Sequence, residues 1–422
     1  MKNESYRTRI VDAKLEALLS VFGGVLIVGP KWCGKSWTAS NQANSEVYID
    51  IEDNKRRALL MPDVILDGPS PRLIDEWQDA PVLWDAARRK IDDEHRPGLL
   101  IFTGSAVPII SGENKPSHTG IGRFARMRMR PLSLYEEGIS SGKVSLSALF
   151  EGKSFQACAS DMDYEKALQL ICRGGWPALF WVPEENASMV AMEYLNMVIN
   201  EDISRVDGSK RDPALVQLFM RSLARNSATP VKATSLKADI TERDGSDISE
   251  QTVRSYYEAL KRIFVIEEQD AWLPSLRSRS RIRTTPKRHF TDPSLAAAAL
   301  GATPGILAGD IKTAGFLFET LCFRDLSVYM DALDGKVFHY RDKDNLEGDA
   351  ILQMPDGRWG AVEIKLGTFE FDYAAANLLK LKKKLADDTV SPSFLLIITA
   401  SGGMAWQRED GVIVAPIDCL AP

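Results

Sequence analysis

A glycine-rich loop and a pair of neighbouring carboxylates are the residues of this sequence whose types and spacing could act together on phosphates. The loop follows the apolar run Val25–Val28, which predicts a buried parallel strand that runs into a helix. Such a loop points backbone N–H groups at phosphate oxygens, and the amino end of the next helix adds positive potential. We therefore expect a nucleoside triphosphate to be bound by Gly29, Pro30, Lys31, Trp32, Cys33, Gly34, Lys35, Ser36 and Trp37.

The carboxylates Asp75 and Glu76 end a second short apolar strand, Arg72–Ile74. Lys35 would neutralise the β- and γ-phosphates of the nucleotide. Ser36 and Asp75 would hold Mg²⁺, and Glu76 would polarise the attacking water. This order of residues predicts hydrolysis as well as binding.

Further residues near this core have expected roles with open alternatives. Thr103 or Ser105, at the end of a later strand, could sense the γ-phosphate or belong to a plain strand-end turn. Arg123 is the expected arginine finger, acting on its own nucleotide or, in a homo-oligomer, on that of a neighbouring subunit. The alternative is a solvated basic strand face. ATP is favoured over GTP because Asn114–Ser117 lacks the aspartate of a guanine-reading motif.

The composition bounds the kind of protein. With 422 residues, 45% of them hydrophobic and 26% charged, the chain has room for two to three globular domains. A net charge of −6 argues against a surface that is basic throughout, but it leaves local basic patches open. The five cysteines form no CxxC pair, so neither a zinc site nor a disulfide framework is expected. No apolar run approaches the roughly 18 residues of a membrane span, and we expect a cytoplasmic protein.

The predicted organisation is of the α/β class. Residues 1–140 form an α/β nucleotide-binding core, and residues 141–210 form a helical lid or connector. Residues 211–285 give helices at Ala214–Ala224 and Glu250–Ile263 and then a strand, which suggests a winged helix whose last helix would read DNA. Basic residues then alternate along an extended segment, which suits nucleic-acid phosphates, a solvated hairpin or a protein-facing edge. They are Arg277, Arg279, Arg281, Arg283, Lys287 and Arg288.

Residues 286–422 carry a second possible active site. The pattern predicts strands at Gly348–Gln353 and Trp359–Lys365 that would bring Asp349, Glu363 and Lys365 together on one face. Two carboxylates could hold a second Mg²⁺ or Mn²⁺, and the lysine could orient water. Glu319 adds an acid on an otherwise apolar helix face. The alternative is that Asp349 and Glu363 are ordinary strand-end charges and that Glu319 pairs with a nearby lysine.

Over nearly its whole length the chain resembles the prokaryotic AAA-type ATPases that carry a C-terminal domain of the DUF4143 type. Asp349 with Glu363-Ile364-Lys365 is similar to the core of the PD-(D/E)xK, restriction-endonuclease-like fold. The resemblance implies ATP binding and a winged helix joined to a nuclease-like domain, which in such proteins can be catalytically silent. The segments on which the resemblance rests are Gly29-Pro30-Lys31, Gly34-Lys35-Ser36, Tyr48–Asp53, Leu73–Glu76, Phe102–Ser105, Gly122-Arg123, Arg130–Ser133, Gly174–Pro177 and Pro286–Asp292.

Three functions fit these residues. The first is a Mg²⁺-dependent ATPase whose nucleotide state controls nucleic-acid or partner binding by the C-terminal parts. The second is a metal-dependent DNA nuclease regulated by ATP. The third is a nucleotide switch in signalling or defence, with little turnover.

Overall fold

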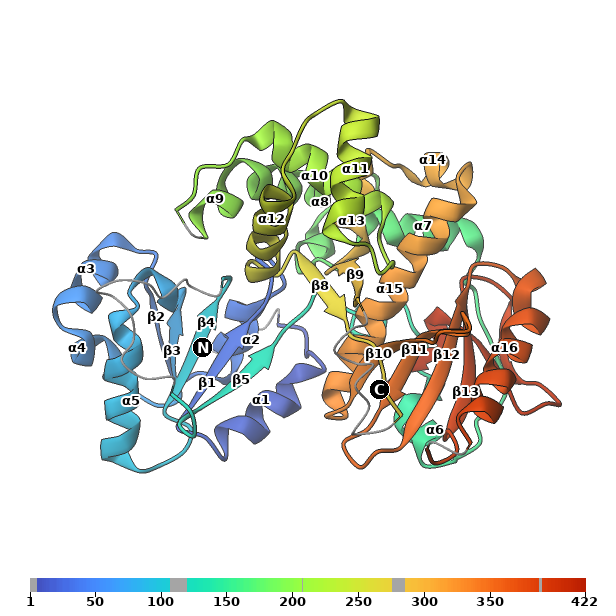
Figure 1. Ribbon diagram of the computed structural model, residues 1–422. Helices are drawn as coiled ribbons and strands as arrows, with labels where there is room; N and C mark the ends of the chain where they lie inside the picture. Colours follow the sequence, from blue (N-terminus) through green and yellow to red (C-terminus); the bar gives the residue numbers. More distant parts are fainter. Residues whose placement is uncertain (1–5, 107–119, 207, 275–284, 387–388) are drawn as a thin grey trace. The chain divides into compact units, whose positions relative to one another are not determined.

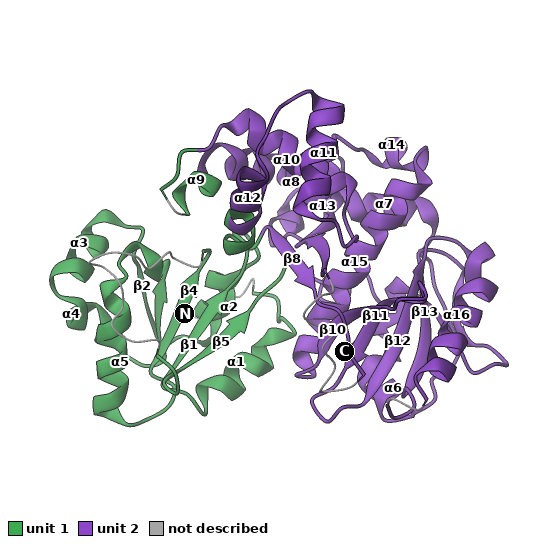
Figure 2. Ribbon diagram, in the orientation of Figure 1, with its two compact units in different colours: residues 1–131, 202–210, 259–264 green, residues 132–201, 211–258, 265–422 purple. Residues whose placement is uncertain are grey.

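The computed structural model describes residues 6–106, 120–206, 208–274, 285–386 and 389–422. Contacts divide the chain into two units, which Figure 2 colours separately. Unit 1 comprises residues 1–131, 202–210 and 259–264, and unit 2 comprises residues 132–201, 211–258 and 265–422. The first stretch of unit 1 ends at Pro131, whereas the boundary expected from the sequence is at residue 140.

Unit 1 is built on a parallel sheet with the strand order β2-β3-β4-β1-β5 (Figure 1). Its strands are β1 Gly24–Val28, β2 Ser45–Tyr48, β3 Arg72–Asp75, β4 Leu100–Gly104 and β5 Phe124–Arg128. Its helices are α1 Val11–Leu19, α2 Lys35–Gln42, α3 Glu52–Leu60, α4 Pro62–Leu66, α5 Val82–Glu94 and the short α9 Ile203–Arg205.

Both faces of this sheet are apolar, which is why its strands read as continuous hydrophobic runs. Val25 and Ile27 of β1 pack in one core with Leu15 of α1, whereas Leu26 packs against the opposite core with Leu83 of α5. Burial on both faces is the condition under which parallel sheets are stable. The α/β class expected for the nucleotide-binding part is confirmed.

Unit 2 contains a mixed sheet with the order β10-β11-β12-β13-β15-β14-β7. Helix α16, Phe371–Lys384, packs its apolar side on the sheet through residues such as Leu378 and Leu381. No helix among the described residues is long and apolar enough to cross a membrane. The strands of the sheet are β7 Cys158–Ala159, β10 Lys336–Arg341, β11 Glu347–Gln353, β12 Trp359–Lys365, β13 Phe394–Thr399, β14 Met404–Gln407 and β15 Ile413–Pro416.

The segment expected to be a separate connector contributes to this C-terminal sheet. Strand β7 pairs with β14, and β6, Val144–Ser145, pairs with β16, Leu420–Ala421. Edge pairing of two-residue strands uses backbone groups alone and leaves no periodic pattern of side chains, so the sequence did not reveal it.

The remaining elements of unit 2 are mostly helical and include an antiparallel hairpin, β8 Ile266–Gln269 with β9 Lys287–Phe290. Three helices, α10 to α12, precede this hairpin in the chain. The helices are α6 Leu146–Phe150, α7 Tyr164–Arg173, α8 Ala187–Met197, α10 Pro213–Arg225, α11 Ala233–Asp244, α12 Glu250–Arg262, whose last residues belong to unit 1, α13 Pro293–Leu300, α14 Pro304–Ala308 and α15 Ile311–Ala332.

A buried ion network centred on Arg324 of α15 joins distant segments of unit 2. The Arg324 guanidinium, 1% exposed, donates to Asp292 at 2.8 Å and to Asp325 at 2.7 Å. Asp292 also accepts the backbone N–H of Gly175 at 3.0 Å, and the Gly175 carbonyl accepts the N–H of Leu132 at 2.6 Å. One guanidinium thus holds the loop at Gly175, the start of α13 and the long helix α15 together.

Replacing Asp292 with alanine should strongly destabilise unit 2. The change removes one partner of a fully buried ion pair and leaves the Gly175 N–H without its acceptor, and losses of this kind cost about 3–5 kcal/mol. Urea denaturation followed by circular dichroism measures the change. Glu151→Ala, which removes an exposed pair with Lys153, is the control and should leave the unfolding midpoint almost unchanged. Equal effects of the two substitutions would contradict the assigned role of the network.

Candidate functional site

The loop predicted to bind phosphate lies between the end of β1 and the start of α2, at the carboxyl edge of the parallel sheet. Trp32 and Gly34 both have left-handed backbone conformations, with φ of 62° and 97°. Left-handed residues at alternate positions of a loop turn its backbone N–H groups toward one side, which forms a concave site for anions. Gly29 cannot carry a side chain, because a Cβ there would lie 2.2 Å from the carbonyl oxygen of Met129.

Two buried cationic side chains, Lys35 and Arg9, donate hydrogen bonds to backbone carbonyls of this loop. The Lys35 ammonium, 5% exposed, donates to the Pro30 carbonyl at 2.7 Å and so lies against the loop it serves. The Arg9 guanidinium donates to the carbonyls of Cys33 at 2.9 Å and Arg130 at 3.0 Å, which ties the loop to the end of β5. The sequence did not single out Arg9, since a lone arginine before a helix carries no motif.

The hydroxyls of Ser36 and Thr103 converge on the same oxygen atom of Asp75. Ser36 donates to Asp75 Oδ1 at 2.8 Å, and Thr103, which is fully buried, donates to the same atom. Burial raises the pKa of the Asp75 carboxyl, and the two hydrogen bonds partly offset that rise. A carboxylate that is short of positive charge beside a hydroxyl suits a hard cation such as Mg²⁺.

Glu76 is held in a strained conformation next to this pair. Its φ of 51° and ψ of 45° lie in the left-handed region, which residues other than glycine rarely adopt. Its Oε2 atom accepts hydrogen bonds from the Gln78 side chain and, at 3.1 Å, from Ser105. Thr103 and Ser105 thus each donate a hydrogen bond to one of the two carboxylates, and the phosphate sensing suggested for either of them stays a prediction.

Lys31 reaches out of the loop to a residue far away in the sequence. Its ammonium lies 2.6 Å from Asp202 Oδ1, and the side chains are 35% and 9% exposed. Asp202 belongs to the part of unit 1 that follows helix α8 in the chain. No sequence signal connects these two residues, which are separated by 171 positions.

Arg123 lies at the opposite edge of the sheet from the loop. It directly precedes β5, whose first residue pairs with Gly24 at the start of β1. The whole strand, roughly 15 Å at about 3.3 Å per residue, separates it from the loop. Its guanidinium pairs with Asp92 at 2.8 Å. The expectation that Arg123 acts on the nucleotide of its own chain is therefore wrong, because the distance from Arg123 to the loop exceeds the reach of an arginine side chain.

In unit 2 the predicted residues Glu319, Asp349, Glu363 and Lys365 are brought together, and Lys287 joins them. Lys365 Nζ lies 2.9 Å from Glu363 Oε2 and 3.5 Å from Asp349 Oδ2. Lys287 Nζ lies 2.5 Å from Glu319 Oε1 and 3.6 Å from Asp349 Oδ1. We call these five side chains the carboxylate–lysine cluster.

Charge and burial in this cluster oppose each other. Burial raises the pKa of Glu319 to about 7, and it does the same for Glu363, where Asp349 adds to the rise. Burial would raise the pKa of Asp349 as well, but Lys287 and Lys365 outweigh it and hold that pKa below its usual range. The cluster is thus a set of ion pairs that already neutralise one another. Over the described ranges, no group of three His, Cys, Asp or Glu side chains is arranged to hold a metal ion.

Only two of the six basic residues predicted to form a strip, Lys287 and Arg288, lie in the part of the chain that the structure describes. Arg277, Arg279, Arg281 and Arg283 lie outside the described residues. Lys287 is 8% exposed and belongs to the carboxylate–lysine cluster, and Arg288 places its guanidinium 4.3 Å from the ring centre of Tyr257. These last two cations therefore do not continue an exposed strip, because each is occupied by a partner within unit 2.

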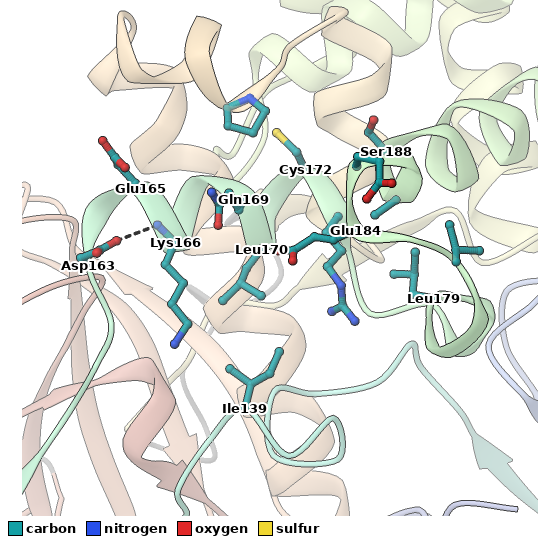
Figure 3. Close-up of a pocket in the computed structure, with 15 residues that line it drawn as sticks. Ile139, Asp163, Glu165, Lys166, Gln169, Leu170, Cys172, Leu179, Glu184 and Ser188 are labelled. Carbon is teal, nitrogen blue, oxygen red and sulfur yellow. Dashed lines mark hydrogen bonds between the residues drawn. The ribbon is translucent and has the colours of Figure 1, made fainter. Parts of the chain in front are cut away.

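A separate cavity of about 770 Å³ opens beside α7 in unit 2 (Figure 3). Several of its charged residues serve the fold: Asp163 accepts the N–H of Lys166 at 2.8 Å and caps α7, and Arg173 pairs with Glu137. Burial raises the pKa of the Cys172 thiol in its wall to about 12, so this sulfur is not a nucleophile near neutral pH.

Comparisons with known protein families divide the chain into three parts. Residues 22–137 match the family described as AAA domain. Residues 164–305 match a domain of unknown function (DUF8612), and residues 314–420 match a domain of unknown function (DUF4143).

Similar proteins include an uncharacterized protein of Mycobacterium tuberculosis and one of Mycobacterium bovis. Each is 22% identical over 362 residues, which cover 85% of this chain and 73% of the relative. Similar solved structures include a Walker-type ATPase of Pyrococcus abyssi, with 15% identity, coverage of 70% of this chain and 99% of that chain, and a TM-score of 0.42. The Aeropyrum pernix ORC1 protein in complex with DNA has 12% identity, coverage of 70% and 93%, and a TM-score of 0.26.

Glu137, the partner of Arg173, should make unit 2 less stable as pH rises toward neutrality. Burial raises the pKa of Glu137 from 4.5 to about 7, an effect that Arg173 only partly offsets. Between these values the folded chain keeps a proton that the unfolded chain has lost, so the free energy of unfolding falls with rising pH by at most about 1.4 kcal/mol per unit.

The substitution Glu137→Gln removes this titration. The stability of the variant relative to wild type should therefore rise between pH 4.5 and 7 and stay level above that range. Urea denaturation at a series of pH values measures the difference. A difference that is flat with pH would contradict the raised pKa.

Proposed function

We propose that this chain, in which an AAA domain of the P-loop ATPase type precedes a DUF4143 domain, is a Mg²⁺-dependent ATPase. Its nucleotide state would control the binding of a partner by the C-terminal parts. The observation that carries the ATPase is the convergence of the Ser36 and Thr103 hydroxyls on Asp75, with Glu76 fixed beside them.

Each residue of the site has a role that its contacts support. Lys35 would exchange the Pro30 carbonyl for the β- and γ-phosphate oxygens of ATP. Ser36 and Asp75 would hold Mg²⁺, which when bound neutralises phosphate charge. Glu76, oriented by Gln78 and Ser105, would polarise the attacking water and accept its proton.

The Lys31–Asp202 ion pair supports a route from nucleotide to partner binding. Phosphate groups that arrive at the loop would compete with Asp202 for the Lys31 ammonium, because both are anionic ligands of the same cation. Loss of the pair would release the segment around Asp202, which continues from helix α8. The state of the nucleotide would thereby change the restraint on a segment outside the phosphate loop.

An arginine finger, if this ATPase uses Arg123, would have to act on another subunit. That role requires a homo-oligomer in which the edge of the sheet at Arg123 meets the phosphate loop of a neighbour. The pair with Asp92 would then open to free the guanidinium.

Nucleic acid is the partner that the order of elements in unit 2 favours. Helices α10 to α12 followed by the β8–β9 hairpin have the order of a winged helix, and the part of α12 in unit 2 exposes Arg254, which pairs with Glu250 one turn earlier. The arginines at 277, 279, 281 and 283 would add phosphate contacts. The nuclease alternative would need a metal ion at Glu319, Asp349, Glu363 and Lys365, and the ion pairs of these residues weigh against it.

Two substitutions separate nucleotide binding from turnover. Lys35→Ala should abolish binding of ATP, because the loop loses the cation that faces the phosphates. Glu76→Gln should bind ATP normally but reduce the hydrolysis rate by about 100-fold or more, since the water loses its base. Binding of a fluorescent ATP analogue and release of phosphate measure the two effects, with Glu16→Gln on the surface of α1 as the matched control. Hydrolysis by Glu76→Gln at the wild-type rate would refute the assigned role.

Asp202→Asn should increase the affinity for ATP by about three- to fivefold. In this variant ATP no longer has to break the Lys31–Asp202 ion pair. A partly exposed ion pair of this kind contributes up to about 1 kcal/mol. Lys31→Ala should weaken binding, because it removes the cation from both partners. Isothermal titration calorimetry measures the affinities, and Glu193→Gln at an exposed position of α8 is the matched control. Unchanged or weaker binding by Asp202→Asn would rule out this competition.

A further inference from the structure

A lysine side chain lies among the carboxylates where a nuclease-like domain would hold a divalent metal ion. The Lys287 ammonium is 2.5 Å from Glu319 Oε1 and 3.6 Å from Asp349 Oδ1, and its side chain is 10% exposed. The residue comes from strand β9, whereas the carboxylates come from α15 and β11. A cation that belongs to the chain itself therefore bridges two acids from different elements.

We propose that the Lys287 ammonium takes the place of the metal ion in the carboxylate–lysine cluster. The cluster would then be a permanent, metal-free ion network and not a centre for phosphodiester cleavage. This inference is independent of the proposed ATPase, because all five residues belong to unit 2.

The oxygen atoms of the cluster are already engaged by donors of the chain. Asp349 Oδ2 accepts the N–H of Ile364 at 2.9 Å and also faces Lys365. Glu363 Oε1 accepts the Asn377 amide at 2.6 Å, and its Oε2 faces Lys365 at 2.9 Å. A metal ion needs several free oxygen ligands at little more than 2 Å, and it would have to displace these donors.

The balance of charge leads to the same conclusion. Three carboxylates and two ammonium groups leave at most one net negative charge. A divalent ion added to this buried set would leave net positive charge with little access to water, which is strongly unfavourable. Removal of the Lys287 charge would restore an excess of carboxylate and make room for a cation.

Titration with Mn²⁺ alone, without nucleotide, tests this inference on the full-length chain. Electron paramagnetic resonance measures how much Mn²⁺ is bound. Any Mn²⁺ binding that is lost when Asp349→Asn is introduced is assigned to the cluster. We expect wild type and Asp349→Asn to bind Mn²⁺ equally. Lys287→Met should gain one site at least about tenfold tighter than any site of wild type. Lys287→Met/Asp349→Asn should lose that site again, and Lys153→Met on the surface is the matched control.

Two results would overturn the proposal. One is a Mn²⁺ site in wild type that Asp349→Asn abolishes, since a metal would then bind with Lys287 present. The other is a folded Lys287→Met variant that gains no site, since Lys287 would then not be what excludes the ion. If Lys287→Met does not fold, Lys287→Gln repeats the test, because it keeps a hydrogen-bond donor beside Glu319 and removes only the charge.

Discussion

A charged side chain that is taken out of water needs a partner, and this requirement shapes three separate regions of the protein. In unit 2 it brings Asp292 and Asp325 to the buried guanidinium of Arg324. At the carboxylate–lysine cluster it brings Lys287 and Lys365 to three carboxylates. In unit 1 the described residues give Asp75 two hydroxyl donors, from Ser36 and Thr103, and no ion pair.

This difference in charge compensation is the physical basis on which we propose chemistry at Asp75 and a closed ion network at the carboxylate–lysine cluster. Burial raises the pKa of Asp75 and leaves a demand for positive charge at the edge of the sheet where the phosphate loop begins. In the carboxylate–lysine cluster that demand is already met by two ammonium groups of the chain. The same kinds of residue, two or three acids and a lysine, thus suit a Mg²⁺ site in one unit and a closed ion network in the other.

Much of the architecture could be predicted from the sequence, because long apolar periods and turn residues carry local information. The strand expected at Trp359–Lys365 has the bounds of β12, and the phosphate loop lies where β1 meets α2. Some partners that tertiary packing brings together were predicted, such as Lys365 with Glu363 and a lysine for Glu319, but partners far apart in the sequence could not be named. Asp202 reaches Lys31 across 171 positions, and Lys287 was read as part of a phosphate-binding strip although it is buried against Glu319. The distance of Arg123 from the phosphate loop of its own chain could not be predicted for a related reason, since it depends on strand register and not on composition.

We propose that ATP bound at the phosphate loop breaks the Lys31–Asp202 ion pair and so loosens the segment around Asp202. Hydrogen–deuterium exchange of the full-length chain, with and without Mg²⁺ and a slowly hydrolysed ATP analogue, tests it most directly. The account predicts slower exchange in the backbone of residues 29–36, where N–H groups meet phosphates, together with faster exchange in residues 198–206, which lose the Lys31–Asp202 restraint. Slower exchange in the loop with no change at residues 198–206 would contradict the coupling, and no change in either segment would contradict nucleotide binding itself.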